Sequence, residues 1–328
     1  MRIIGEDNIG VVMKNYLTVI LNAALILCGA VTVFCQEGTA VATGKPIMWE
    51  PANISQRNLY LGPGGAEMQP DFSRAKFLGE QAGGNNLKYR IADTSGHVWV
   101  VKMADESQPE VAAVRLLWAI GYPTEINYIV PKMNMGSKGN FKNVRAEARP
   151  EGVNRLDRWS WENNPFKGSR EFDGLKMMMA MFNNWDLKDE NNVILQKDGK
   201  DFYAIADLGS SFGRGATTVG GRGGRSVNNP VDYANSKFIT TVRNGFVELD
   251  FKTYNDRFIQ GISVENARWL AGLLRQLSDA QIQDAFRAAN YNAEEVIILS
   301  KAFQTRIKQL DDVTRLPKPP TRSGRSTN

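Results

Sequence analysis

Apolar and polar residues alternate along several short runs between residues 75 and 149. A period of two is typical of strands that bury one face, and turn-forming Gly, Asn, Asp and Ser separate these runs. The runs predict five strands, at 75–78, 87–92, 97–103, 126–131 and 141–149. Between the third and fourth, an apolar run that proline opens and glycine closes predicts a helix at 109–121. This part of the chain is therefore expected to be an antiparallel sheet with one helix.

Helical spacing dominates after residue 150. Residues 172–182 form a methionine-rich apolar run, and apolar residues recur three or four positions apart along 263–277. Ser-Asp-Ala-Gln at 278–281 is a capping box that begins another helix, and the last helix is expected at 293–310. Strands are expected only in short pieces. The predicted fold class is α+β, with a mainly helical second half.

Residues 1–36 differ from the rest of the chain. Residues 16–34 are apolar with three polar interruptions, and Lys14 precedes them. A basic start before an apolar core is typical of a secretory signal, whereas the length of the run nearly suffices for an uncleaved membrane anchor. A buried core helix is the third interpretation. We therefore expect an exported protein, periplasmic or secreted, or one anchored to a membrane at its N-terminus.

Two other segments are expected to lie outside the main domain. Residues 37–74 are rich in Gly, Pro, Asn and Gln, which predicts an extended leader that packs on the domain or is partly disordered. Residues 313–328 are basic and contain closely spaced prolines, which predicts a disordered tail. The remaining length suffices for a two-lobed domain with a substantial core, divided at about residue 150.

Charge and composition exclude some functions. The net charge of the 328-residue chain is +5, but much of the excess comes from Arg214, Arg222, Arg225 and the tail, without a stripe of basic and aromatic residues. A nucleic-acid-binding face is therefore not expected. The single histidine, His97, argues against a histidine base or a zinc site. Both cysteines, Cys28 and Cys35, lie in the N-terminal segment, so late cleavage would leave a chain without thiols.

The candidate chemistry lies between Met177 and Gly213. The apolar helix is followed by the polar sequence Asp-Leu-Lys-Asp-Glu-Asn at 186–191, by two short strands joined by a Lys-Asp-Gly-Lys turn, and by Asp207-Leu208-Gly209. A hairpin brings the residues at its base together, so Asn191 and Asp207 are expected to lie close in space. Phosphoryl transfer uses a carboxylate near the attacking hydroxyl, with an Asn or Asp and a second carboxylate as metal ligands.

The sequence Trp-Asp-Leu-Lys-Asp-Glu-Asn resembles the catalytic loop H-R-D-L-x-x-x-N of protein kinases, and Asp-Leu-Gly resembles their D-F-G motif. Because His and Arg are missing before Asp186, the resemblance is to the atypical branch of the protein-kinase-like superfamily, which includes phosphatidylinositol kinases and bacterial toxin-type kinases. It implies a two-lobed fold over about residues 75–310. It also implies that Asp186 is the catalytic base or orients the hydroxyl, that Lys188 contacts the transferred phosphate, and that Asn191 and Asp207 hold Mg²⁺.

The resemblance extends to the predicted sheet. Lys102 ends the third strand and matches the kinase V-A-I-K lysine, which contacts the ATP phosphates. An unpaired ammonium among apolar neighbours would be costly. Glu110 is the implied ion-pair partner, and Glu106 is the alternative because the interval from Lys102 to Glu110 is short.

Two further features of a kinase small lobe are expected. A glycine-rich turn, with Gly79, Gly83 and Gly84, would bring backbone N–H groups close to phosphates, although it lacks the full G-x-G-x-x-G pattern. Residues 150–152 would be the hinge between the lobes, where adenine contacts the backbone.

These features predict an ATP- and Mg²⁺-dependent phosphotransferase that moves the γ-phosphate to a hydroxyl of a protein, lipid or small molecule. A catalytically inactive binding module with this fold is the alternative, and nucleotidyl transfer is another use of the same site. An exported structural protein would instead place Lys102 and Asp207 far apart.

Overall fold

The computed structural model describes residues 41–81, 86–215, 224–253 and 255–315. The expected signal or anchor at 1–36 lies outside these residues, as does the tail from residue 316 onward. None of the helices within the described part is both long and apolar enough to cross a membrane.

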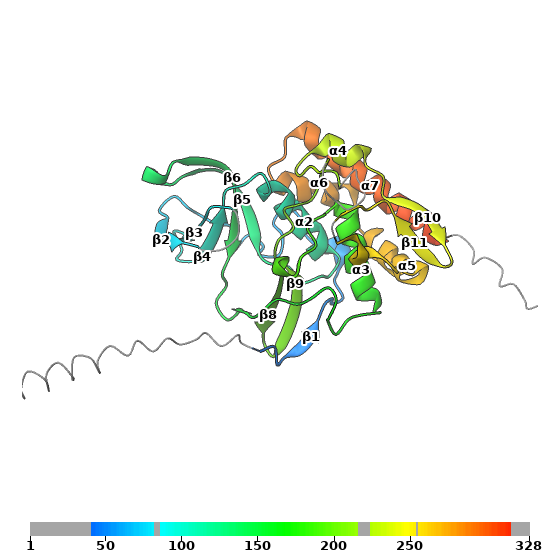
Figure 1. Cartoon of the computed structure of the whole chain (residues 1–328). Coiled ribbons are helices and arrows are strands. Elements are labelled where there is room, and N and C mark those ends of the chain that lie inside the picture. Colours follow the sequence, from blue (N-terminus) through cyan, green and yellow to red (C-terminus); the bar gives the residue numbers. More distant parts are fainter. Residues whose placement is uncertain (1–40, 82–85, 216–223, 254, 316–328) are drawn as a thin grey trace, which may run out of the picture. The chain divides into compact units, whose positions relative to one another are not determined.

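A five-stranded antiparallel sheet forms the small lobe (Figure 1). Its strands, with spatial order β2-β3-β4-β6-β5, are β2 (Lys76–Glu80), β3 (Lys88–Ala92), β4 (Val98–Lys102), β5 (Asn127–Asn134) and β6 (Asn140–Ala148). One short 3₁₀ helix, η2 (Gly136–Lys138), turns the chain between β5 and β6. The prediction of five strands is confirmed, and the predicted helix is α2 (Ser107–Ala119), between β4 and β5.

The two faces of this sheet differ in chemistry, because alternate residues of a strand point to opposite faces. One face buries an apolar cluster that includes Ile91, Trp99, Val101 and Val144. The opposite face carries charged side chains: Lys88, Lys102 and Arg145 lie side by side across β3, β4 and β6. The strand pattern therefore gives the small lobe one apolar face and one charged face.

Helix α2 (Ser107–Ala119) connects β4 to β5, and nearly all of its residues are buried. It packs against β5 and β6 of the small lobe and against α6 (Asp279–Ala288) of the large lobe. Gly121 follows the helix with φ +102°, a left-handed conformation that favours glycine. Burial on all sides explains why the apolar residues of α2 are not confined to one stripe, although the helix also buries Glu110 and Arg115.

The large lobe contains a second, smaller sheet of spatial order β1-β9-β8-β7. It consists of β1 (Lys45–Ile47), β7 (Asn154–Arg155), β8 (Asn192–Lys197) and β9 (Lys200–Ile205). The β8–β9 hairpin turns at Asp198 and Gly199, whose φ values of +50° and +71° suit a two-residue turn. This is the predicted hairpin, and its base lies at Asn192 and Ile205.

Helices supply most of the large lobe, as predicted. They are α3 (Arg170–Phe182), α4 (Pro230–Asn235), α5 (Val264–Leu274), α6 and α7 (Ala293–Arg315), with the 3₁₀ helices η3 (Asp189–Asn191) and η4 (Asp256–Ile259) and a hairpin of β10 (Ile239–Arg243) and β11 (Phe246–Leu249). The capping box at Ser278 and Gln281 is present at the start of α6. Helix α7 continues to Arg315, past the expected end at 310, because Thr314 is buried and its carbonyl oxygen accepts hydrogen bonds from Arg268.

Arg306 of α7 holds the end of α3. Its buried guanidinium donates to the carbonyl oxygens of Ala180 (3.1 Å) and Met181 (3.2 Å) and to Ser236 Oγ (2.7 Å). It also lies 4.3 Å from the centre of the Tyr233 ring. Helix α3 ends at Phe182, and its C-cap residue Asn183, in a left-handed conformation, begins the polar loop.

The segment before the small lobe pairs and packs with the large lobe. Strand β1 pairs in parallel with β9, and Met48, Ile54 and Leu59 are buried in the main core. A short 3₁₀ helix, η1 (Ile54–Gln56), follows β1, and Gln281 of α6 donates to the carbonyl oxygen of Ile54 (2.8 Å). Residues 45–59 therefore contribute a strand and core side chains to the large lobe.

Candidate active site

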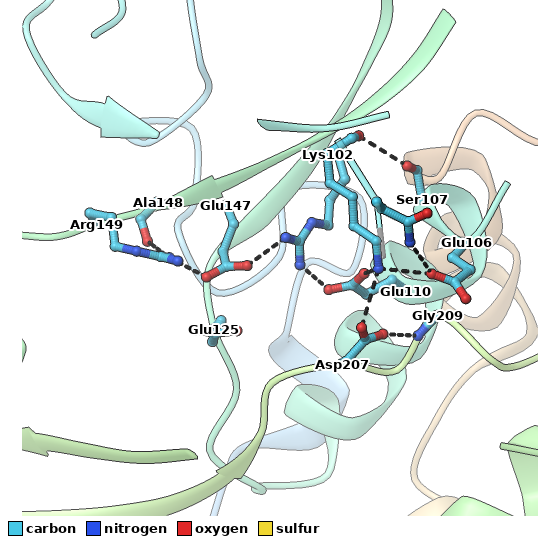
Figure 2. Close-up of polar contacts among 12 residues, drawn as sticks. Lys102, Glu106, Ser107, Glu110, Glu125, Glu147, Ala148, Arg149, Asp207 and Gly209 are labelled. Carbon is cyan, nitrogen blue, oxygen red and sulfur yellow. Dashed lines mark hydrogen bonds and ion pairs between the residues drawn. The ribbon is translucent and has the colours of Figure 1, made fainter. Parts of the chain in front are cut away.

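Lys102, the last residue of β4, is the centre of a buried ion cluster (Figure 2). Only 2% of the residue is exposed, and its Nζ lies 2.9 Å from Glu106 Oε2, 3.2 Å from Asp207 Oδ2 and 3.6 Å from Glu110 Oε2. Burial alone would lower the pKa of this ammonium, but Glu110 and Asp207 outweigh burial and raise the pKa above its ordinary value. The side chain is therefore held charged and in place, between both expected glutamate partners and Asp207.

Glu110 lies on the first turn of α2 and is almost completely buried. It accepts a short hydrogen bond from Arg145 Nη1, on the neighbouring strand β6. Burial raises the pKa of Glu110 to about 7, although Arg145 and Lys102 act in the opposite direction. Of the two glutamates, Glu106 is closer to Lys102, and Glu110 joins Lys102 to Arg145.

The ion cluster continues along β6, which the sequence reasoning missed. Arg145 Nη2 lies 2.7 Å from Glu147 Oε2, and Glu147 in turn contacts Arg149 and Arg155. Arg155 also forms a close ion pair with Glu125. The available signal was Val-Arg-Ala-Glu-Ala at 144–148, where two charged residues alternate with apolar ones inside a strand.

A cavity of about 530 Å³ lies beside this cluster and brings together residues from distant parts of the chain. Lys102, Asn191 and Asp207 all contribute to its lining. Apolar side chains line another part of it: Val100, Leu156, Val193 and Ala206. A cavity with both an apolar wall and convergent polar groups is the usual form of a small-molecule site.

Asp207 directly follows β9, at the position predicted from the hairpin. Its Oδ1 accepts a hydrogen bond from the backbone N–H of Gly209 (3.0 Å), and its backbone N–H donates to Asn191 O (3.2 Å). Burial would raise the pKa of this carboxyl, but Lys102 more than offsets burial and the pKa is lowered. Asp207 is therefore ionised beside Asn191, with about a third of its side chain exposed.

The polar loop fixes the position of Asp186. Asn191 Nδ2 donates to Asp186 O (2.7 Å) and to Asp186 Oδ2 (3.1 Å), which leaves the amide oxygen of Asn191 for another partner. Lys188 Nζ lies 2.7 Å from Asp186 Oδ1. From outside the loop, Thr253 Oγ1 donates to the carbonyl oxygen of Trp185 (2.5 Å). Asp186 and Lys188 thus form a pair connected to the cavity through Asn191.

Lys88 is a second lysine at the cavity, and sequence reasoning missed it. It lies opposite Lys102 on β3, is half-buried and lines the cavity. Within the described part of the chain, no carboxylate is found within 4.0 Å of its Nζ. Burial, followed by repulsion from Lys102 and Arg145, lowers the pKa of Lys88. Its place beside the predicted glycine-rich turn was the only available signal.

The structure says little about that turn. Gly79 lies at an irregularity in the β2–β3 pairing with φ +148°, and a Cβ there would meet no atom within 4 Å. Gly83 and Gly84 lie outside the described residues. Gln81 and Lys88, on either side of them, both line the cavity.

The donor atoms at the cavity suit Mg²⁺ held jointly with phosphate. No group of three or more His, Cys, Asp or Glu side chains is placed to hold a metal ion anywhere in the described ranges. Asp207, with a carboxylate, and Asn191, with an amide, both line the cavity, and a backbone hydrogen bond joins the two residues. Mg²⁺ commonly takes one or two protein oxygens and fills its remaining positions with phosphate and water.

Neither a protein-family model nor a curated protein matches the chain. Among solved structures, the chain is similar to the Helicobacter pylori proinflammatory kinase CtkA, with 12% identity, coverage of 75% of this chain and 96% of that chain, and a TM-score of 0.47. It is also similar to the Rio2 kinase from Chaetomium thermophilum, solved as an ADP/Mg²⁺-phosphoaspartate complex, with 12% identity, 70% coverage of each chain and a TM-score of 0.31. Both scores are low, so function has to be inferred from the geometry of the cavity.

Proposed function

We propose that the protein is an ATP-dependent phosphotransferase of the kinase-like type. One observation carries this proposal: Lys102 from the sheet, Asn191 from the polar loop and Asp207 from the end of the hairpin line a single cavity. These are the three residue types that phosphoryl transfer needs around a triphosphate, since its catalysis consists mainly of positioning and charge stabilisation.

The cavity has separate regions for the two ends of ATP. Val100, Val193 and Ala206 offer apolar contact to a base. Lys102 and Lys88 provide two ammonium groups for the phosphates, and the carboxylates around Lys102 fix its position. Lys88 has no such carboxylate partner in the described structure, so a phosphate oxygen would be its counter-ion.

The acceptor hydroxyl is assigned to Asp186. This carboxylate would accept a hydrogen bond from the hydroxyl and orient it toward the γ-phosphate, while Lys188 would contact the transferred group. Asn191 links the two regions, since its side-chain amide N–H groups hold Asp186 and its amide oxygen would be a ligand of the metal. Bound Mg²⁺ would neutralise charge on the phosphates, and Asp207 and Asn191 would hold it.

Transfer from labelled ATP tests this function. The purified protein is incubated with Mg²⁺ and either γ- or α-labelled ATP, together with protein, lipid and sugar acceptors. Label transferred only from the γ position supports a kinase, whereas label from the α position indicates nucleotidyl transfer. Asp207→Ala should abolish transfer, and Asp312→Ala, which removes an exposed carboxylate paired with Lys308, should not.

A binding measurement separates the enzyme from an inactive module. ATP with Mg²⁺ should raise the melting temperature of the unaltered protein, and the rise should disappear in Asp207→Ala. Stabilisation without transfer to any acceptor would favour a binding module. A melting temperature that ATP and Mg²⁺ leave unchanged would refute the nucleotide site itself.

A further inference from the structure

A second cavity, of about 370 Å³, lies next to the expected hinge at residues 150–152. Its lining comes from the leader, the end of α2, the segment before β5, the end of β6, and the β8–β9 hairpin. Arg149 and Arg155 line both this cavity and the candidate active site. The proposed function places neither the nucleotide nor the acceptor in this cavity, although Pro150, from the hinge expected to contact adenine, is part of its lining.

The walls of this cavity are mostly apolar. Ile47, Pro51, Trp118, Pro123, Val153 and Phe202 are among the residues that line it. The charged residues of the lining are four cations (Arg57, Arg149, Arg155 and Lys197) and two carboxylates (Glu50 and Glu125). Both carboxylates are already paired, Glu125 with Arg155 and Glu50 with Lys200 (2.8 Å), and Arg149 pairs with Glu147, so within the described residues Arg57 and Lys197 are the lining cations without a carboxylate partner. The cavity is thus apolar with a cationic surplus.

Arg57 is the cation best placed to receive an anion here. It is half-buried, its guanidinium carbon lies 4.4 Å from the centre of the Trp118 ring, and its Nη1 donates a short hydrogen bond to Trp118 O. Within the described residues, Arg57 has no carboxylate within 4.0 Å. A guanidinium has five N–H donors in a planar fork, and the neutral Trp118 carbonyl oxygen leaves the positive charge without a partner of opposite charge. Burial also lowers the pKa of Arg57, which an anion would reverse.

We propose that this second cavity binds a small amphipathic anion, an aromatic ring or short aliphatic chain that carries one carboxylate. The carboxylate pairs with Arg57, and the apolar body lies against Trp118, Pro123 and Val153. The size fits, since small-molecule sites usually enclose roughly 300–1,000 Å³ and combine apolar walls with a few polar groups. The proposal does not depend on the phosphotransferase function, because none of these four residues belongs to the candidate active site.

Titration calorimetry with matched pairs of probes tests this site in the full chain without nucleotide. Phenylacetate is compared with phenylacetamide, and hexanoate with hexanamide, so that each pair differs in charge at nearly constant shape. Both anions should bind saturably with one site, in the millimolar range or tighter, and each should bind at least about tenfold more tightly than its amide, as expected for a charge-assisted hydrogen bond. Failure of both anions to bind, or equal affinity for anion and amide, overturns the proposal.

Two variants locate the binding. Arg57→Gln should remove the preference for the anion and leave the amide affinity unchanged, whereas Arg243→Gln, on the exposed β10 strand, should change neither. Val153→Phe fills the cavity from its half-buried rim and should weaken binding of anion and amide alike, which keeps the test valid if Arg57→Gln does not fold. Anion binding that survives both changes, or that tripolyphosphate displaces, belongs to the other cavity and refutes the assignment.

Discussion

Lys88→Met tests the proposed phosphate contact directly. Lys88 lies opposite Lys102 across β3 and β4, and no carboxylate pairs with it in the described structure. Its ammonium would be about 4 Å from a phosphate oxygen in a bound triphosphate, which corresponds to about 4 kcal/mol of attraction at an effective dielectric constant of about 20. Part of this attraction is offset by lost hydration, and net values for hydrogen bonds to charged groups are about 1.5–3 kcal/mol.

We therefore expect Lys88→Met to weaken ATP binding roughly 10- to 150-fold. The loss should shrink along the series ATP, ADP and AMP and vanish for adenosine, because adenosine offers no phosphate. Calorimetric or fluorescence titration of the four ligands measures this series. Since Lys102 and Arg145 repel the Lys88 ammonium, the melting temperature of the free variant should stay the same or rise.

Two results would refute this reasoning. An equal loss for ATP and adenosine would mean that Lys88 supports the base region rather than the phosphates. Unchanged ATP affinity would mean that Lys88 faces only solvent when the nucleotide is bound. Failure of the unaltered protein to bind ATP would refute the nucleotide site instead, so the two ideas can be told apart.

Three other predictions concern stability. Because burial raises the pKa of Glu110 to about 7, the folded state binds more protons than the unfolded state between about pH 4.5 and 7. The unfolding free energy of the unaltered protein, measured by urea titration, should therefore fall over that range by ~3 kcal/mol at most, relative to Glu110→Gln titrated in parallel. Arg306→Met should lower the unfolding free energy by about 2–4 kcal/mol, because it leaves the carbonyl oxygens at the end of α3 without their donor, whereas Arg243→Met should change it by less than about 0.5 kcal/mol. A chain that begins at residue 75 should fail to give a cooperative thermal transition. The lost burial of Met48, Ile54 and Leu59 is worth about 1.5–3 kcal/mol each, and typical total stability is only about 5–15 kcal/mol. A sharp transition of the shortened chain would show that the leader is dispensable.

Local sequence patterns were sufficient for much of this fold. Alternation identified all five strands of the small lobe, and the Asp198-Gly199 turn identified the β8–β9 hairpin. The same hairpin explains why Asn191 and Asp207 lie together, since they flank its base at Asn192 and Ile205 and a backbone hydrogen bond joins them. The roles of these residues in catalysis stay predictions until the labelled-ATP experiment is done.

Other features depend on contacts that a local pattern does not carry. Strand β1 has only three residues and finds its partner in β9, so its pairing is invisible in the sequence. The alternation of Arg145 and Glu147 indicated a shared face, but whether that face met solvent or a second lobe depended on tertiary packing. The sequence could not decide which glutamate pairs with Lys102. Glu106 directly precedes α2 and Glu110 lies on its first turn, and both carboxylates are within reach of Lys102.

The early position of the leader in the chain also constrains the order of folding. Gly44 donates its N–H to Asp201, 157 residues later, and Gln281 binds the carbonyl oxygen of Ile54 across 227 residues. During synthesis these first segments emerge long before their partners, and closing such long loops slows folding. The large lobe therefore cannot complete its packing around Ile54 until α6 has left the ribosome.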